Sequence, residues 1–400
     1  MNEIHSNRTA LVVGAGVAGL TAAALLRRHG WQVEAIERAP ELRTGGYKVD
    51  ARGAGVEVLR RLGLLDAARE RACHVRAGSV VTAEGRTVAA MGGDTFGGRL
   101  GEDVELERGD LVRLLAEAAG PVRFGTQATG FTEGADGVRV RFSDGTEDTY
   151  AVVLGADGLH SATRGLAGIG SADAVHPLGH AIGVVTMPTS MGLTNEETTF
   201  VTAGRTALLY ATATQPRARA MLLFTHDGPL PRDRPAQVAF LRERYADAGW
   251  RLPEILAALE TADDVYLDAV AQVKLDRWSS GSVGLIGDAA ACASPASGQG
   301  TTLALVTAYV TVAKLRATPD AVPDALHRAE AALRGFVDGN QKLGPSNLKR
   351  MVMGSEKAVT STLTALRVLN ALPFTDLMLG FVARALAKAS AYELPEVRHV

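Results

Sequence analysis

The apolar pattern near the start of the chain predicts a strand, a helix and a second strand. Residues 11–13 (LVV) follow one another without a polar residue, which is typical of a strand buried on both faces. Residues 17–30 are mostly small or apolar and end at Gly30, a residue type that commonly stops a helix. The sequence WQVEAIER (31–38) then indicates another strand. A strand, a helix and a strand in this order form the unit of a parallel sheet.

Helical periodicity returns in later parts of the chain. Apolar residues recur at helical spacing between residues 56 and 65, and again after Asp110, which we expect to be the N-cap of its helix. From Ser297 onward the pattern is mostly helical. Pro323 is a favourable residue for a helix start, and GNQKLGPSN (339–347) predicts a break between helices. The apolar positions of the first two helices are Val56, Leu59, Leu62 and Leu65, and Leu111, Leu114 and Leu115.

Strand patterns occupy the middle of the chain. Residues 76–107 look β-rich with glycine punctuation, and residues 122–158 alternate between apolar and polar positions, which predicts hairpins. Further alternating segments between residues 175 and 275 predict an antiparallel sheet with one buried face. The turn pairs of the hairpins are Asp136-Gly137 and Asp144-Gly145.

A parallel-sheet segment is therefore interrupted by an antiparallel sheet and then resumed. This order predicts an α/β fold with a discontinuous first domain, a β-rich second domain and a helical end. The boundaries that we assign are 1–75, 101–170 and 280–325 for the first domain, 76–100 and 171–279 for the second, and 326–400 for the C-terminal helical segment.

Composition narrows the class of protein. The chain has 400 residues, of which 46% are hydrophobic, so it can bury a sizeable core. Its net charge of −2 gives no electrostatic footprint for nucleic acid. We find no run long and apolar enough to span a bilayer and no metal-ligand spacing, and residues 9–26 lack a signal-peptide cleavage site. The two cysteines, Cys73 and Cys292, cannot form a disulfide framework, and a cytoplasmic location is the simplest setting. Cys292 is interpreted as a small buried hydrophobe.

The turn between the first strand and helix carries the sequence GAGVAG. Gly14 permits a tight turn, Gly16 lets the backbone approach a pyrophosphate, and Gly19 lets the helix pack closely on the strand. The phosphates would then rest on free N–H groups at the helix start. Glu37 follows at the distance where an acidic residue bonds ribose hydroxyls in this fold. The alternative is a Gly- and Ala-rich strand and helix without a ligand.

A second motif, GADGLHSATR, covers residues 155–164. It predicts a strand, a glycine turn at Gly158 and a helix, with Asp157 able to bond a backbone group or a hydroxyl. Asp157, His160 and Ser161 do not form a hydrolase triad, because no G-x-S-x-G sequence occurs and sequence neighbours cannot easily face one another.

The third motif, GLIGDAAACASPASGQG, covers residues 284–300. It predicts a buried strand that ends just before Asp288, whose carboxylate can accept hydrogen bonds from cofactor hydroxyls. Pro295 fixes a loop, and Gly298 and Gly300 open a helix whose N–H groups can face negative charge. The alternative is a plain strand-loop-helix connection with an N-capping aspartate.

The three motifs together resemble the class A, single-component flavoprotein monooxygenases, the p-hydroxybenzoate hydroxylase family. The resemblance covers residues 8–345 and is greatest to the branch of tetracycline-inactivating and actinobacterial tailoring monooxygenases. It implies a Rossmann-type FAD-binding domain interrupted by an antiparallel-sheet substrate domain, and a role in antibiotic biosynthesis or modification.

The resemblance also implies which residues hold a non-covalent FAD. Arg38 matches a residue beside the adenine, and Arg43 matches a proposed nicotinamide contact. The cofactor-binding residues that it implies are Gly14, Gly16, Val17, Ala18, Gly19, Glu37, Arg38, Asp50, Arg52, Arg108, Asp157, Gly158, Gly287, Asp288, Pro295, Gly298, Gln299 and Gly300. Three residues depart from the family pattern: Ala291 where histidine is frequent, Thr302 where asparagine is frequent, and Thr307 where an acidic residue is frequent.

The reaction that the resemblance implies is a hydroxylation. NADPH or NADH would reduce FAD, and the reduced flavin and O₂ would form a flavin hydroperoxide that oxygenates an apolar, electron-rich, aromatic or polyketide-like small molecule. A flavin-dependent reductase or dehydrogenase and a non-enzymatic flavoprotein remain as alternatives. A flavin halogenase is not supported, because the sequence has no WxWxIP motif.

The substrate pocket is expected between the antiparallel sheet and the flavin. Candidate lining residues are Phe200, Leu209, Tyr210 and Phe224, which equally fit the buried core face of the sheet. The sequence nominates no acid or base residue and no oligomeric state.

Overall fold

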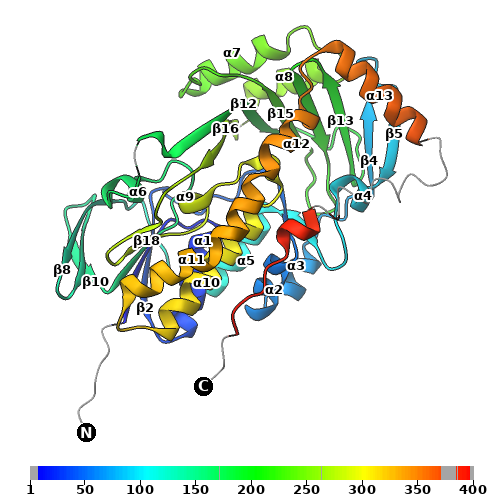
Figure 1. Cartoon of the computed structure of the whole chain (residues 1–400). Coiled ribbons are helices and arrows are strands. Elements are labelled where there is room, and N and C mark those ends of the chain that lie inside the picture. Colours follow the sequence, from blue (N-terminus) through cyan, green and yellow to red (C-terminus); the bar gives the residue numbers. More distant parts are fainter. Residues whose placement is uncertain (1–7, 171, 263, 371–383, 385, 397–400) are drawn as a thin grey trace.

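The computed structural model describes residues 8–170, 172–262, 264–370, 384 and 386–396 (Figure 1). Residues 1–7 of the predicted first domain, and 371–383, 385 and 397–400 of the predicted helical segment, lie outside the described residues.

The first sheet carries the segments in which the three motifs were found. Its strand order in the described chain is β17-β18-β11-β1-β2-β7, and its pairings are parallel except for β17 with β18. The predicted strand–helix–strand unit is confirmed as β1, α1 and β2. The strands are β1 (Thr9–Val13), β2 (Gln32–Glu37), β7 (Arg123–Phe124), β11 (Val152–Gly155), β17 (Ser279–Ser280) and β18 (Val283–Leu285).

Both faces of this sheet are covered, which explains the uninterrupted apolar run of β1. Val12 packs in a cluster with helix residues, whereas Leu11 and Val13 pack against the antiparallel strands β8–β10. The helices of the first cluster include α1 (Val17–Arg28), α5 (Arg108–Ala119), α10 (Gly300–Ala317) and α11 (Val322–Gln341). The predicted hairpins are β8 (Ala128–Gly134), β9 (Gly137–Phe142) and β10 (Glu147–Tyr150).

The second large sheet has the strand order β16-β12-β15-β14-β13-β4-β5 and is antiparallel except for β13 with β4. Figure 1 shows helices α7 and α8 over one of its faces. The strands are β4 (Ala77–Val81), β5 (Thr87–Gly92), β12 (Val175–Thr186), β13 (Glu196–Thr202), β14 (Arg205–Tyr210), β15 (Arg219–Thr225) and β16 (Tyr266–Val273). The two helices are α7 (Arg234–Tyr245) and α8 (Leu252–Thr261).

The remaining elements lie outside the two large sheets. Strands β3 and β6 pair with each other as an antiparallel ribbon. Helix α13 packs along β5 at the edge of the second sheet (Figure 1). These elements are β3 (Lys48–Ala51), β6 (Val104–Glu107), α2 (Ala54–Arg61), α3 (Leu65–Glu70), α4 (Gly93–Gly97), α6 (Ala162–Leu166), α9 (Asp288–Ala291), α12 (Leu343–Met351) and α13 (Glu356–Asn370), with short 3₁₀ turns at Ala172–Ala174 and Pro295–Ser297.

Several local expectations were wrong in detail. The helix expected around residues 56–65 is broken near Gly63, whose φ of 73° ends α2 before α3 begins. Glu107, not Asp110, is the N-cap of α5, and Asp110 lies in the first turn. The break near residue 342 is confirmed, but α12 takes up Gly344. Helices α7 and α8 were not predicted, because the strand patterns around them dominate that part of the sequence.

Residues 386–396 return to the cofactor-motif half of the molecule. The Gln299 side-chain amide donates to the carbonyl oxygen of Leu386 at 3.3 Å, and Asn340 donates to that of Ala389 at 2.9 Å. The Arg61 guanidinium donates to the carbonyl oxygen of Pro395 at 2.8 Å. None of the helices in the described ranges has the length and apolar character that a bilayer crossing requires.

Candidate functional site

The glycine turn after β1 has the geometry that its spacing predicts. Gly14 has a φ of 107°, and a Cβ on it would lie 2.6 Å from the Ala156 carbonyl oxygen. A Cβ on Gly19 would lie 1.9 Å from the Gly14 carbonyl oxygen, so α1 can approach β1 only without a side chain there. A Cβ on Gly16 would meet no heavy atom within 4 Å. The first and third glycines are therefore required by packing, and the second faces open space beside the start of α1.

Glu37 closes the other side of this turn. Its carboxylate accepts hydrogen bonds from the backbone N–H groups of Ala15 at 3.0 Å and Ala39 at 2.9 Å. Arg38, the next residue, is exposed. The acidic group thus lies next to the glycine turn, as expected for a ribose-binding position.

Asp157 and Gly158 form the second turn at the carboxyl end of the sheet. The Asp157 carboxylate accepts from the Ser161 hydroxyl at 2.5 Å and the Thr163 N–H at 2.9 Å, so its side chain caps α6. Gly158 has a φ of 81° and open space at its Cβ position. The expectation that Asp157 bonds a backbone group or a hydroxyl is confirmed, and its partners belong to the protein.

Asp288 begins α9 at the end of the third motif. Gly287 before it has a φ of 58°, and a Cβ there would lie 2.6 Å from the Ala18 Cβ, so this turn packs on α1. Burial raises the pKa of Asp288, while a hydrogen bond from Cys292 and the charge of Arg108 act in the opposite direction. Burial and the charge of Asp288 raise the pKa of Tyr47 to about 12, which places this tyrosine near the same carboxylate.

The loop before α10 contributes more open positions. Gly298 has a φ of 66°, and neither Gly298 nor Gly300 would bring a Cβ within 4 Å of another atom. Gln299 is fully buried, and its side-chain oxygen has no hydrogen-bond partner among the residues that the structure describes. Open glycines, a buried unpaired amide oxygen and the N-terminal N–H groups of α10 together fit a planar polar group such as the flavin ring.

Arg108 begins α5, and its charge acts on Asp288. Its guanidinium donates to the carbonyl oxygens of Arg43 at 3.2 Å and Gly45 at 3.1 Å, which holds the 43–47 loop. The Arg43 side chain itself is exposed.

Asp50 and Arg52, which the resemblance implies as flavin contacts, form an ion pair with each other. The Arg52 guanidinium is almost fully buried and donates to Asp50 at 2.9 Å and to the carbonyl oxygens of Gly97 and Gly98 at 2.7 and 2.6 Å. The Arg52 Nε and the Asp50 Oδ1 are buried without a hydrogen-bond partner among the described residues, so the expected contact of this pair with the flavin stays a prediction. The backbone N–H of Arg52 donates to the Thr302 hydroxyl at 3.1 Å, next to the start of α10.

Three of the four predicted pocket residues lie on the face of the second sheet that packs against α7 and α8. Phe200, Leu209 and Phe224 are buried in the cluster that includes α7 and α8 residues, and Phe224 stacks edge-on against Tyr245. They fill a core and cannot line a pocket on the cofactor side. Tyr210 points the opposite way, and its hydroxyl accepts from the Lys48 N–H at 2.8 Å. Sequence alternation identified the strands but not which set of alternate residues faces the cofactor motifs.

The face toward the cofactor motifs carries an apolar row that the sequence reasoning missed. Strand register places Tyr266 opposite Val184, Val184 opposite Met221, and Met221 opposite Leu208, which lies opposite Thr199. Met221 and Leu208 are only half-buried, and Tyr266 is 47% exposed. Val184, Met221 and Ala296 belong to one apolar cluster, which brings the row to the loop before α10.

A charged row borders this apolar row. Arg219 lies opposite both Thr186 and Tyr210 in the register and pairs with Glu107 of β6. Lys48 lies 2.6 Å from both Glu105 and Glu197. Burial alone would lower the pKa of Lys48, but the two carboxylates raise it overall. These buried ion pairs join the β3–β6 ribbon to the second sheet.

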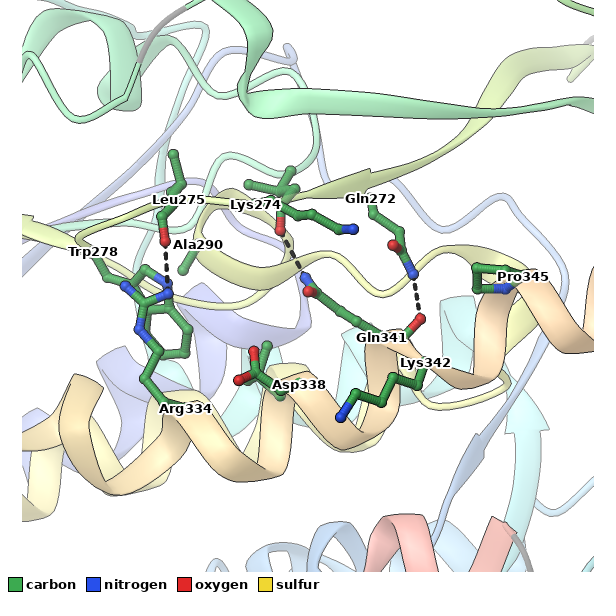
Figure 2. A pocket seen from close by; sticks show the side chains of 12 residues that line it. Gln272, Lys274, Leu275, Trp278, Ala290, Arg334, Asp338, Gln341, Lys342 and Pro345 are labelled. Carbon is green, nitrogen blue, oxygen red and sulfur yellow. Dashed lines mark hydrogen bonds between the residues drawn. The ribbon is translucent and has the colours of Figure 1, made fainter.

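A recess of about 510 Å³ lies outside this region, between the end of β16 and helix α11 (Figure 2). Gln272 donates to the carbonyl oxygen of Gln341 at 2.5 Å, Gln341 to that of Val273 at 2.7 Å, and Arg334 to that of Leu275 at 2.6 Å. These donors are satisfied by the backbone, so the side chains tie α11 to the sheet. The recess is therefore a less suitable cofactor site than the region of open glycines.

Comparison with known proteins identifies the family. The family described as FAD binding domain matches residues 7–337. An uncharacterised protein of Mycobacterium tuberculosis is 38% identical over 349 residues, covering 85% of this chain and 94% of that protein. A flavin-dependent monooxygenase of Legionella longbeachae is 34% identical over 345 residues, covering 85% and 89%.

Solved structures agree with the sequence comparisons. The crystal structure of the tetracycline destructase Tet(51) superimposes with a TM-score of 0.84 at 30% identity, covering 98% of this chain and 100% of that chain. The glycine turns, the Gly287-Asp288 turn and the open loop before α10 lie in the matched span. The chain therefore belongs to the FAD binding domain family, and within it to the FAD-dependent monooxygenases.

Proposed function

We propose that this enzyme hydroxylates an apolar, electron-rich small molecule, with NADPH or NADH as the reductant and O₂ as the oxidant. The observation that carries the substrate class is the half-buried pair Met221 and Leu208 beside the buried Val184, because exposed apolar surface beside a cofactor region favours an apolar ligand. The substrate would lie between this row and the loop before α10. When bound, FAD supplies the hydride acceptance and oxygen activation that no amino-acid side chain provides.

The FAD would lie along the carboxyl edge of the first sheet. The pyrophosphate would rest on the N–H groups at the start of α1, beside Gly16, and the adenosine ribose would face Glu37. The remaining contacts that we propose come from the turns at Gly158 and Asp288 and from the loop before α10. In this proposal the cofactor would lie in the 1–75, 101–170 and 280–325 domain and the substrate against the 76–100 and 171–279 domain.

The protein's own groups would orient the reactants and exclude water. The N-terminal N–H groups of α10 would stabilise negative charge on a bound ring, since a helix N-terminus carries partial positive charge. Arg108 would contribute a second positive charge while its bonds to the 43–47 loop hold that loop in place. Because Arg43 is exposed on the same loop, we propose it as a contact for the transient nicotinamide cofactor.

The proposal is tested on the purified protein in two steps. Acid precipitation should release all of the flavin as FAD, since no covalent link is expected. Oxygen uptake with NADPH should then rise when a substrate is added. Tetracycline is a suitable first compound, because a solved neighbour is named a tetracycline destructase and the molecule is a hydroxylated polycycle. Under labelled O₂ the product should gain one labelled oxygen atom, and a product that is reduced without label would contradict the proposal.

A further inference from the structure

Three side chains from distant parts of the chain meet at the edge of the apolar row. The Tyr266 hydroxyl donates to the Asp268 carboxylate at 3.1 Å. The His160 Nε2 atom lies 3.0 Å from the same carboxylate oxygen, and the Ala269 N–H donates to the other one at 2.8 Å. His160 comes from the loop after Gly158, so a residue of the second motif reaches the substrate sheet. Neither the resemblance nor the comparisons assign a role to this cluster.

The position of Tyr266 makes the cluster relevant to the substrate. Tyr266 and Asp268 are alternate residues of β16 and therefore share the face that carries Val184. The Tyr266 ring is 47% exposed beside this apolar row, although its strand is paired with β12. Burial and the charge of Asp268 raise the pKa of Tyr266, with further contributions from Tyr47 and Asp288, so the ring also lies near the cofactor-side groups.

The hydrogen bond to Asp268 fixes what Tyr266 can recognise. A tyrosine hydroxyl has one hydrogen to donate and an oxygen that can accept. Because its hydrogen is directed at a carboxylate, the oxygen remains as an acceptor for a ligand. A substrate hydroxyl can donate to this oxygen, whereas a methyl ether at the same place cannot.

The hydrogen bonds that Asp268 accepts keep its carboxylate ionised. The hydrogen bond with Asp268 raises the pKa of His160, against the opposing effects of partial burial and of the charges of Arg164 and Arg38. Burial alone would raise the pKa of Asp268, but the bonds from His160, Ala269 and Tyr266 lower it overall. An ionised Asp268 is a strong acceptor, which holds the Tyr266 hydrogen in this direction.

From this arrangement we propose that Tyr266 recognises a hydroxyl group of the substrate as a hydrogen-bond acceptor, and that Asp268 and His160 are its positioning residues. The inference deepens the proposed function, since it rests on the same substrate face, and it narrows the substrate to hydroxylated apolar compounds. The recognition step involves no covalent change.

The test compares two matched probes on the FAD-loaded enzyme, 2-hydroxyanthraquinone and 2-methoxyanthraquinone, at a mildly acidic pH where the hydroxyl keeps its proton. Binding is measured by the change in flavin absorbance. A hydroxyl-specific site should favour the first probe by roughly ten- to a hundredfold, because the bound probe would cover the Tyr266 oxygen and the ether would leave it unpaired. In Tyr266→Phe the preference should fall to within about threefold. Tyr392→Phe is the matched control, because the Tyr392 hydroxyl donates to the Ala332 carbonyl oxygen away from this face.

The positioning residues are tested with the same ratio. Asp268→Leu should reduce the preference as much as Tyr266→Phe does, while Asp268→Asn, which retains an acceptor, should keep part of it. A purely structural role would lower the affinity for both probes and leave their ratio unchanged. Equal affinity of both probes for the wild-type enzyme, or an undiminished preference in Tyr266→Phe, would overturn the inference. Loss of FAD binding would instead count against the proposed function, so the two failures are distinguishable.

Discussion

The backbone N–H of Gly287 donates to the hydroxyl of Thr307 at 2.9 Å. Since Thr307 lies on α10, this bond ties the turn that presents Asp288 to the helix that begins beside the open loop. The same hydroxyl donates to the carbonyl oxygen of Leu303 at 2.7 Å. A threonine therefore stabilises the turn at a position where the family often has an acidic residue.

Thr307→Val should destabilise the protein and loosen the cofactor turn. The change leaves the buried Gly287 N–H without a partner, which costs about 1–3 kcal/mol. Urea unfolding of the apo-protein measures this loss. Thr364→Val on α13 is the matched control, because the Thr364 hydroxyl also bonds a carbonyl oxygen one turn earlier but is exposed. Its stability should change by no more than about 0.5 kcal/mol, and equal losses in both variants would contradict the role of Thr307.

Two glycine substitutions should separate cofactor binding from folding. Gly16→Ala places its Cβ in open space, so the apo-protein should stay within about 1 kcal/mol of wild type while FAD affinity falls by more than about tenfold. Gly19→Ala forces the Cβ against the Gly14 carbonyl oxygen and should destabilise the fold itself by about 1–3 kcal/mol or more. FAD titration and thermal unfolding of both variants provide the comparison. Tight FAD binding by Gly16→Ala would show that the phosphates lie elsewhere.

Asp288 should lower the stability of the apo-protein and raise the affinity for FAD. Burial raises its pKa, so the folded apo-protein holds this proton more tightly than the unfolded chain does. The apo-protein therefore loses stability from this group as the pH rises above the unfolded value of about 3.9. Asp288→Asn should be more stable than wild type without FAD, with a difference that grows from acidic to neutral pH. Unfolding curves across this range would reject the prediction if the variant were less stable throughout.

Substitution of Asp288 or of Arg108 should lower the affinity for FAD. Asp288→Ala and Arg108→Ala each remove a charged hydrogen-bonding group, which contributes about 1.5–3 kcal/mol, or roughly ten- to a hundredfold in affinity. Titration of the apo-proteins with FAD measures the effect. Arg113→Ala is the control, because Arg113 lies on the same helix but pairs with Asp110 at an exposed site. Unchanged affinity in both site variants would reject their assignment.

Truncation of the adjacent residues Leu208 and Leu209 on β14 should have different effects, one on the substrate KM and the other on stability. Leu209 is fully buried against the α7 and α8 side, so Leu209→Ala should cost about 2–5 kcal/mol of stability with little direct effect on substrate affinity. Leu208 is half-buried on the cofactor side, so Leu208→Ala should cost less stability and should change the substrate KM. Urea unfolding and steady-state oxygen uptake separate the two effects. A KM change confined to Leu209→Ala would contradict the assignment of the faces.

The features that the sequence predicted are those decided by local chemistry. Gly14, Gly16 and Gly19 act within one turn, so their spacing was enough to predict the geometry. The face on which Leu208 or Leu209 lies depends on register with strands far along the chain, and no local signal carries it. The partners of Arg52 come from the 97–98 turn, and the partner of His160 lies 108 residues away on β16. Such contacts depend on how the two sheets are joined, which periodicity does not reveal.

The hydrogen bond from Arg61 to Pro395 spans 334 residues. During synthesis, the helix that contains Arg61 leaves the ribosome long before its partner has been made. The hydrogen bonds from Gln299 to Leu386 and from Asn340 to Ala389 likewise cannot form until residues 386–389 have been made. The nascent chain can therefore pair β1, β2, β7 and β11 early and add β18 later, but the surroundings of the cofactor loop can be completed only after translation has passed residue 395. Flavin loading is then expected to be a late, post-translational step, and nascent chains stalled before this point should remain colourless.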